Sequence, residues 1–434
     1  MGLVKDFLDL NYSYEKPLLL GFSGGSDSSV LLHLLLDIRS KKPFPLHLAH
    51  IDHGWREESH NQALDLKKLA ESLNLPFHSI RLKKYDGINL EEEARKQRFI
   101  FFKKIYREYQ CEALLLAHQN QDQSETVFKR LLEGSHWTNM QGIKSMSTYD
   151  GMIVWRPLLK MRKKDIEKVI EEKQLQVIRD STNLDARFLR SRMRLSLFPY
   201  LEAQFGKNFN NNIDRLSLTI QEFNRYFDNK LSKYLKQSSK GPLGVFLDLN
   251  ELEEPIEIEF VVKSFFQNND LVLSATELST IVYLIHSHST NKTMTIKNRM
   301  VGIDRRHLFL FNDLPISEKN REIIYDKKVL TGLWSGELTQ NTGNESVDWK
   351  KLWISDVEVK IPSNIEWMGF FPDHCDEKQR EILNKWWSKH KIPAFLRQKV
   401  PILGSGNKVL HEFLTGKSLS ITSSQRVFLL RINK

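Results

Sequence analysis

Six consecutive residues near the N-terminus combine the backbone freedom and the side-chain donors that a phosphate site needs. Gly24 and Gly25 leave room for an anion beside the main chain, and the serines around them offer hydroxyl donors. A helix that starts directly after such a turn adds unpaired N–H groups and the positive end of its dipole. The predicted phosphate-binding residues are Ser23, Gly24, Gly25, Ser26, Asp27 and Ser28.

The acidic member of this turn, Asp27, requires a positive partner. A carboxylate beside phosphates is repulsive unless a cation bridges them, so Mg²⁺ coordination is its most economical role. Asp122 and Glu125 lie three residues apart, on one face of a predicted helix start, and can share that cation. We therefore predict that Asp27, Asp122 and Glu125 bind Mg²⁺ and act in catalysis. A solvated helix N-terminus with favourable acidic residues is the alternative for the last two.

The segments around these residues alternate between strand-like and helix-like patterns. Short apolar runs predict buried strands at residues 17–22, 46–52, 77–82 and 112–118. Helical patterns lie between them at residues 28–39, 58–74 and 90–110. This order predicts an α/β fold with a mostly parallel sheet and helices on both faces. Ligands of such sheets bind beyond the C-terminal ends of the strands, which is where the candidate residues fall.

The pattern changes after residue 205. Apolar residues recur at steps of three and four from Ile213 to Leu235, which predicts one long amphipathic helix. A polar segment at 312–322 is typical of a linker, and short strands with tryptophans follow it. We expect a Rossmann-like parallel-sheet domain at 1–205, a mainly helical domain at 206–311 and a small α+β domain at 323–434.

The composition narrows the class of protein. The chain has 64 Lys and Arg against 54 Asp and Glu, a net charge of +10, which favours a polyanionic partner, nucleic acid ahead of membrane. Simple solubility is the alternative. Its two cysteines, Cys111 and Cys375, form no Cys-x-x-Cys pair, which argues against a disulfide framework and a cysteine-built metal site. No apolar run approaches the ~20 residues that span a bilayer, and the N-terminus lacks a signal-peptide pattern, so we expect a cytoplasmic protein.

The glycine turn differs from two common phosphate motifs. It lacks the Lys-Ser or Lys-Thr of a Walker A loop and the third glycine of the dinucleotide fingerprint. It resembles instead the Ser-Gly-Gly-x-Asp-Ser signature of PP-loop ATP pyrophosphatases, which split ATP to AMP and pyrophosphate. Further blocks resemble the tRNA(Ile)-lysidine synthase family, strongly over about the first 200 residues and loosely after them. These blocks are 50–59, 93–99, 117–126, 155–162, 180–185 and 190–194.

The resemblance implies a two-step reaction. With ATP and Mg²⁺ as cofactors, the wobble cytidine (position 34) of the CAU-anticodon isoleucine tRNA is adenylated. The ε-amine of free L-lysine then replaces the activated oxygen, giving lysidine, AMP and pyrophosphate. The resemblance also implies tRNA positioning by the middle domain, acceptor-stem binding by the C-terminal domain, and allows a homodimer.

The resemblance assigns further roles to residues of these blocks. Arg95 is the expected fourth catalytic residue and a candidate partner for the carboxylate of the lysine. Asp52, Asp122 and Glu125 are the candidates that face its amine. The expected substrate-binding residues are His50, Asp52, His53, Arg56, Arg190, Arg192 and Arg194.

Two departures from the family pattern keep alternatives open. Gln119 stands where the family usually has a second histidine, and Gln121 where it usually has the first of two aspartates. These changes favour a non-catalytic tRNA-binding protein, whereas the intact turn argues against it. A PP-loop thiolase would need cysteine or cluster ligands that are missing here. A synthetase of small metabolites would not need the basic surplus or the 156–194 region.

Overall fold

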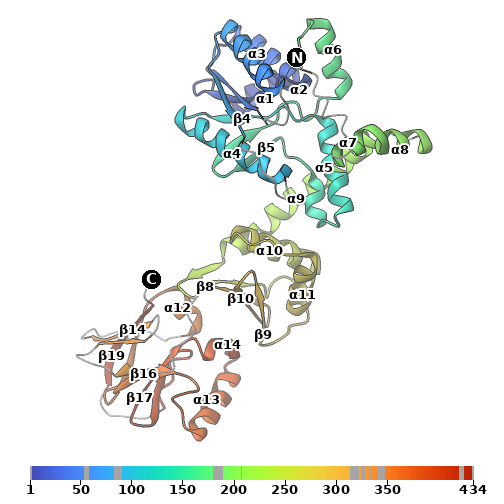
Figure 1. Cartoon of the computed structure of the whole chain (residues 1–434). Coiled ribbons are helices and arrows are strands. Elements are labelled where there is room, and N and C mark those ends of the chain that lie inside the picture. The colour runs from blue at the N-terminus through green and yellow to red at the C-terminus, as the bar shows by residue number, and fades with distance from the viewer. Residues whose placement is uncertain are drawn as a thin grey trace. The chain divides into compact units, whose positions relative to one another are not determined.

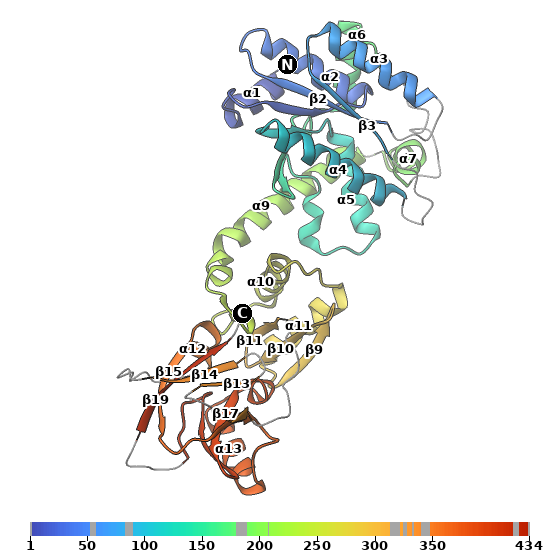
Figure 2. The same cartoon turned by 60° about the vertical axis from the view of Figure 1, so that its left-hand side comes forward.

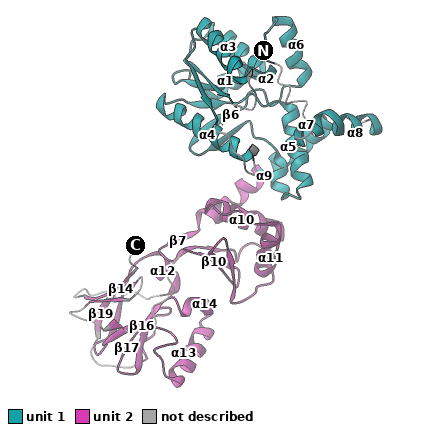
Figure 3. Cartoon of the chain, viewed as in Figure 1, with its two compact units in different colours: residues 1–224 teal, residues 225–434 magenta. Residues whose placement is uncertain are grey.

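The structure is a computed structural model. It describes residues 2–52, 58–82, 90–178, 189–206, 208–312, 322–323, 328–331, 334–339, 348–419 and 425–432. Two expected substrate contacts, His53 and Arg56, lie outside the described residues. The chain forms two compact units, residues 1–224 and 225–434 (Figure 3). No helix in the described ranges is long and apolar enough to cross a membrane.

Unit 1 is built on a six-stranded sheet with the order β3-β2-β1-β4-β6-β5. Figure 1 shows this sheet among the helices of the unit. The first five strands in this order run parallel, and β5 adds an antiparallel edge. The α/β class and the mostly parallel sheet are confirmed. The strands are β1 (Leu18–Gly21), β2 (Leu46–Asp52), β3 (Phe77–Arg81), β4 (Ala113–Leu115), β5 (Met146–Tyr149) and β6 (Met152–Trp155).

Both faces of this sheet are covered, as its continuous apolar strands require. Successive side chains of a strand point to opposite faces, so Leu18 and Leu20 enter one core and Leu19 the other. The first core is closed by α1 (Gly2–Asn11), α2 (Ser26–Arg39), α3 (Glu58–Ser72) and α6 (Lys163–Lys173), and the second by α4 (Leu90–Glu108) (Figure 2). The remaining helices of this region are α5 (Asn120–Leu132), α7 (Leu189–Arg192), α8 (Phe198–Phe205) and α9 (Phe209–Lys236).

The first compact unit extends into α9 and ends at Asn224. The early turns of α9 are hydrogen-bonded to a short 3₁₀ helix, Trp137–Gln141, that follows α5. Asn224 Nδ2 donates to the Thr138 carbonyl at 2.9 Å, and Gln221 Nε2 donates to the Gln141 carbonyl at 3.0 Å. These contacts tie the first half of the amphipathic helix to the α/β domain.

Residues 206–311, expected to form a mainly helical domain, contain strands as well as helices. Beside α9, α10 (Pro255–Asn268) and α11 (Ala275–His286), this region forms a five-stranded antiparallel sheet. Its order is β7-β8-β11-β10-β9. The strands are β7 (Ser239–Gly241), β8 (Gly244–Asp248), β9 (Lys292–Ile296), β10 (Arg299–Asp304) and β11 (His307–Phe311).

The C-terminal region adds two four-stranded sheets, β12-β16-β17-β18 and β13-β14-β19-β15. One apolar core joins Phe246 and Phe309 of the preceding sheet to Trp353, Trp387 and Phe428, so both regions belong to the same unit. The strands are β12 (Glu322–Ile323), β13 (Lys328–Thr331), β14 (Trp334–Thr339), β15 (Val357–Pro362), β16 (Trp367–Phe370), β17 (Pro401–Ser405), β18 (Lys408–Glu412) and β19 (Gln425–Ile432). The helices are α12 (Trp349–Ile354), α13 (Glu377–Lys389) and α14 (Ala394–Arg397).

A buried histidine should make unit 2 sensitive to acid. His411 on β18 is 1% exposed, and its Nδ1 lies 3.0 Å from Ser418 Oγ. Burial lowers the pKa of His411 from 6.5 to about 4. As the pH falls below 6.5, His411 becomes protonated in the unfolded chain but stays neutral in the folded chain. The free energy of unfolding therefore decreases until about pH 4, where the folded chain also binds the proton. The expected loss is roughly 3 kcal/mol.

The measurement is urea unfolding of the full chain between pH 7 and pH 4, followed by tryptophan fluorescence. His411→Gln cannot titrate and should flatten the pH dependence of the unit 2 transition. His286→Gln, on the exposed surface of α11, is the matched control. An equal pH dependence in the parent and in His411→Gln would contradict this account of the histidine.

Candidate active site

The turn between β1 and α2 has the geometry of an anion site. Gly24 has a φ of +77°, and an added Cβ would lie 2.7 Å from Ile178 Cδ1 and 2.8 Å from Leu66 Cδ2, so only glycine fits there. Gly25 is the N-cap of α2 and makes no side-chain cap hydrogen bond. A Cβ on Gly25 would meet only Ser23 Oγ, at 3.4 Å. The first N–H groups of α2 therefore remain available to an anion.

The serines of the turn hold its shape. Ser23 Oγ lies 3.1 Å from Ser28 Oγ and accepts a hydrogen bond from the Gly25 N–H at 3.3 Å. Ser28, which is buried, also donates to the Gly25 carbonyl at 3.1 Å. Ser26 Oγ donates to Asp27 Oδ1 at 3.1 Å. All six predicted phosphate-binding residues thus lie in one preorganised turn at the C-terminal end of β1.

Asp27 has a cationic partner that the sequence pattern did not reveal. Lys163 Nζ lies 3.0 Å from Asp27 Oδ1 and 2.8 Å from Ser26 Oγ. Lys163 is the first residue of α6 and follows Arg162 in the block that starts at Trp155. Its place directly after a matching block is the only signal in the sequence that could have identified it.

The two acidic residues of α5 converge on an arginine. Arg194 donates from Nε and Nη2 to Glu125 Oε1 at 2.9 and 2.7 Å, and its Nη2 lies 3.8 Å from Asp122 Oδ1. Glu125 is 0% exposed, and its Oε2 is buried without a hydrogen-bond partner within the described part of the chain. Burial raises the pKa of Glu125, while Arg194 opposes the shift. The Glu125 carboxylate therefore keeps one acceptor oxygen for a further donor.

The three predicted metal ligands do not form one cluster. Across the described ranges, no three His, Cys, Asp or Glu side chains lie close enough to hold an ion together. Arg194 instead lies within electrostatic range of Glu125, Asp122 and Asp27. Asp27 alone still fits a nucleotide-bound Mg²⁺, because both of its side-chain contacts use Oδ1, and such ions are held by one or two carboxylates together with phosphates.

The residues at the end of β2 are buried and support the turn. His50 Nδ1 lies 2.9 Å from the Phe22 carbonyl, and its ring stacks on Phe77. Because a carbonyl only accepts, Nδ1 carries the proton in this contact. Burial lowers the pKa of His50. Asp52 is buried 3.7 Å from Arg81 Nε. His50 is thus hydrogen-bonded to the backbone of Phe22, the residue directly before the phosphate turn.

A second feature of the site is a concentration of arginines around His118. Burial and these arginines together lower the pKa of His118 to about 3, so the imidazole stays neutral. None of the four arginines forms an ion pair with a carboxylate of the described residues. We call them the arginine group: Arg95, Arg98, Arg156 and Arg190.

The arginine group has unsatisfied donors. Arg156 is 9% exposed, and the Nε atoms of Arg156 and Arg98 are buried without hydrogen-bond partners in the described structure. Burial, with repulsion from Arg95, lowers the pKa of both Arg98 and Arg156 to about 10. Guanidinium groups at this density, without a carboxylate partner among the described residues, favour an anionic ligand.

Comparison with known proteins decides the family. Residues 3–201 match the family of the PP-loop domain, which implies use of ATP. The chain is 34% identical over 422 residues to the tRNA(Ile)-lysidine synthase of Protochlamydia amoebophila (strain UWE25), across 95% of this chain and 92% of that relative. The chain belongs to the tRNA(Ile)-lysidine synthase family.

Two further similarities cover smaller parts of the chain. The tRNA(Ile)-lysidine synthase of Chlamydia muridarum (strain MoPn / Nigg) is 34% identical over 301 residues, which is 67% of this chain and 92% of that relative. Among solved structures, the U34-tRNA thiolase NcsA from Methanococcus maripaludis matches 51% of this chain and 78% of its own, with 19% identity and a TM-score of 0.42. A likeness this weak has no bearing on function.

The structure explains one departure from the lysidine synthase pattern. Gln119 is the N-cap of α5, where its side-chain oxygen accepts from the Gln121 N–H at 2.8 Å. Asp122 Oδ2 accepts from the Gln119 N–H at 2.8 Å, which completes a capping box. An amide in place of the usual imidazole thus secures the helix that carries Glu125.

The remaining predicted residues of this lysidine synthase family member lie on the surface of unit 1. Arg95 is exposed on α4 with its guanidinium 4.9 Å from the Phe99 ring centre. Arg190 and Arg192 are exposed on the short helix α7, and Arg190 lies within electrostatic range of His118. Arg98, Arg156 and His118 lie within the matching blocks 93–99, 155–162 and 117–126, but nothing in the sequence indicates that they belong to one anion-attracting group.

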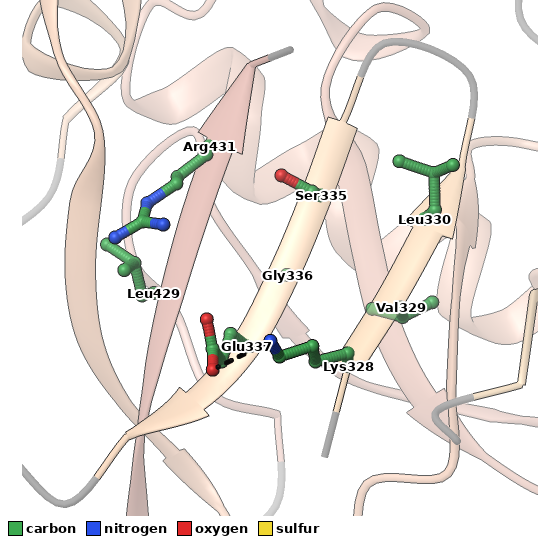
Figure 4. Close-up of a pocket in the computed structure, with 8 residues that line it drawn as sticks. All are labelled: Lys328, Val329, Leu330, Ser335, Gly336, Glu337, Leu429 and Arg431. Atoms are coloured by element: carbon green, nitrogen blue, oxygen red, sulfur yellow. Dashed lines mark ion pairs between the residues drawn. The ribbon is translucent and has the colours of Figure 1, made fainter. Parts of the chain in front are cut away.

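A groove in unit 2 has a different character. It has a volume of about 430 Å³ and lies on the β13-β14-β19 face, lined by Lys328, Val329, Leu330, Ser335, Gly336, Glu337, Leu429 and Arg431 (Figure 4). Its two cations are paired with acids, Lys328 with Glu337 at 3.5 Å and Arg431 with Asp356 at 3.3 Å. The groove offers neither the unpaired charge nor the motifs of the site in unit 1.

Proposed function

We propose that this chain joins free L-lysine to C2 of cytidine 34 in the CAU-anticodon isoleucine tRNA, consuming ATP and releasing AMP and pyrophosphate. The observation that carries the proposal is 34% identity to a lysidine synthase over 95% of the chain, with the phosphate turn intact. Mg²⁺ as cofactor, a cytoplasmic location and a homodimer belong to the same proposal. Sedimentation of the full chain tests the homodimer.

In the first step, the 2-oxygen of the cytosine attacks the α-phosphate of ATP. A C–O–P bond forms, the bond to the β-phosphate breaks, and pyrophosphate leaves. The open N–H groups at the start of α2 are aimed where negative charge grows, which is electrostatic stabilisation. Mg²⁺, held by Asp27, would neutralise further phosphate charge.

In the second step, the ε-amine of lysine forms a bond to C2, and AMP leaves with the former base oxygen. The amine must be neutral to attack, so a nearby base takes its proton. We assign this role to Glu125, whose Oε2 lacks a partner in the described structure and whose pKa burial raises. Glu125 is preferred over His118 for this role, because burial and the arginine group lower the pKa of His118 to about 3.

The remaining substrate contacts follow from charge. Asp52 and Asp122 face the lysine ammonium in this proposal, and Arg95 faces its carboxylate. The arginine group fits a phosphate of the anticodon loop, where an unpaired base can be splayed into a pocket. In unit 2, Lys417 Nζ lies 3.4 Å from the Trp386 ring centre, a cationic and aromatic surface suited to the acceptor stem.

The decisive experiment supplies ATP, radiolabelled lysine and a cytidine-34 isoleucine tRNA, and analyses the digested tRNA by mass. We expect lysidine at position 34 and one pyrophosphate released per lysidine. Sulfur incorporation would favour the thiolase alternative. Binding of tRNA without pyrophosphate release would favour a non-catalytic binding protein.

A further inference from the structure

We propose that Lys163 binds the β- and γ-phosphates of ATP, and hence the pyrophosphate that leaves. This inference rests on the proposed use of ATP by the phosphate turn. It adds a residue from outside the glycine-rich motif to the site, and it assigns that residue to a defined part of the nucleotide.

The position of Lys163 is unfavourable without an anion. Its side chain contacts Ser26 and Asp27, the first two residues of α2, while its own backbone starts α6. The ammonium group of Lys163 therefore lies at the positive end of the α2 dipole. Arg194 adds its charge to the same region, since Asp27 lies within its electrostatic range. A single carboxylate does not balance this arrangement, whereas a polyphosphate does.

The ion pair itself is weak enough to be exchanged. The side chains of Lys163 and Asp27 are 38% and 31% exposed, and ion pairs with this access to water contribute little stability. When Asp27 engages a nucleotide-bound cation, the ammonium of Lys163 is released on a flexible four-carbon stem. The nearest open anion position is the start of α2, where the phosphates are expected.

Lys163 would supply the phosphate-binding lysine that the turn itself lacks. A Walker A loop carries its own lysine, which reaches the β- and γ-phosphates. The turn at 23–28 contains no basic residue. Lys163 arrives from 136 positions further along the chain and places its Nζ 2.8 Å from Ser26 Oγ. The fold thus brings a lysine to the phosphate turn, although the turn itself contains none.

The test compares direct binding of ATP, AMP and inorganic pyrophosphate to the full chain by calorimetry, with and without Mg²⁺. Lys163→Met keeps the aliphatic stem and removes the charge, Lys163→Arg keeps the charge, and Lys164→Met is the exposed neighbour control. We expect Lys163→Met to weaken ATP and pyrophosphate binding by roughly 10- to 100-fold. AMP binding should change less than about twofold, and Lys163→Arg should restore most of the loss.

A second pair of variants separates a phosphate contact from mere neutralisation of Asp27. If Lys163 contacts phosphate, Lys163→Met weakens pyrophosphate binding in an Asp27→Asn background as well. If it only neutralises Asp27, that background removes the effect and overturns the proposal. Equal losses for AMP and ATP would also overturn it, because they indicate a folding defect of the site. A wild-type chain that binds pyrophosphate in this way but forms no lysidine would refute the proposed function and leave the Lys163 assignment intact.

Discussion

Asp27→Asn is expected to lower ATP–pyrophosphate exchange by roughly 100- to 1,000-fold, the usual effect of removing one preorganised electrostatic group from a reacting centre. The asparagine keeps the shape of the side chain and can still accept from Ser26 and Lys163. It loses the charge that holds a phosphate-bound cation. Because Asp27 is partly exposed, the melting temperature should change little.

The measurement is exchange of labelled pyrophosphate into ATP in the presence of tRNA. Asp37→Asn is the matched control, since Asp37 lies on the same helix, α2, and pairs only weakly with His33 at 3.5 Å. Full exchange activity in Asp27→Asn would show that the cation is held elsewhere. Loss of exchange in both variants would point to a damaged helix.

Glu125→Gln is expected to stop lysine transfer while adenylation continues. Glutamine can still accept from Arg194 through its carbonyl oxygen, so the packing around α5 is preserved. It cannot take the proton of the lysine amine, and loss of a general base lowers the rate by roughly 100- to 10,000-fold. Adenylated tRNA should therefore accumulate in a single turnover.

Mass analysis of digested tRNA at successive times distinguishes this role from metal binding. If Glu125 held the cation, pyrophosphate release would fall together with lysidine formation. Glu133→Gln, at the exposed C-terminal end of α5, serves as control. Normal lysidine formation by Glu125→Gln would show that another group deprotonates the amine.

The parts of the fold that local pattern determines were predictable. The strand at 46–52 matches β2 at both ends, because a short, mostly apolar segment lies here between Pro45 and the polar residues that follow Asp52. The phosphate turn was also predictable, since its glycines act through their backbone and its serines through hydroxyl groups that bond within the turn. Strands β7 and β8 were harder to predict, because they are short and lie between strongly helical segments.

The contacts of the site that the sequence did not predict join segments that are far apart along the chain. Lys163 reaches Asp27, and Arg194 reaches Glu125, across 136 and 69 positions, and no local pattern specifies either pair. The predicted three-carboxylate cluster assumed that acids near one sheet edge would share a cation. The structure instead places Asp122 in the local capping box of α5 and pairs Glu125 with Arg194, which lies 69 positions further along the chain.

Helix α6 is tethered to the phosphate turn at both ends, through Lys163 at its start and through the Ile178 N–H, which donates to the Gly24 carbonyl at 2.9 Å just after its end. Local opening of α6 therefore disrupts the nucleotide site, so a bound nucleotide must raise the free energy of that opening. At ATP concentrations about 100 times Kd, amide hydrogen exchange in residues 163–173 should slow by up to ~100-fold. Amides of α4, on the opposite face of the sheet, should be much less affected, so that the helix outside the motif reports occupancy of the turn.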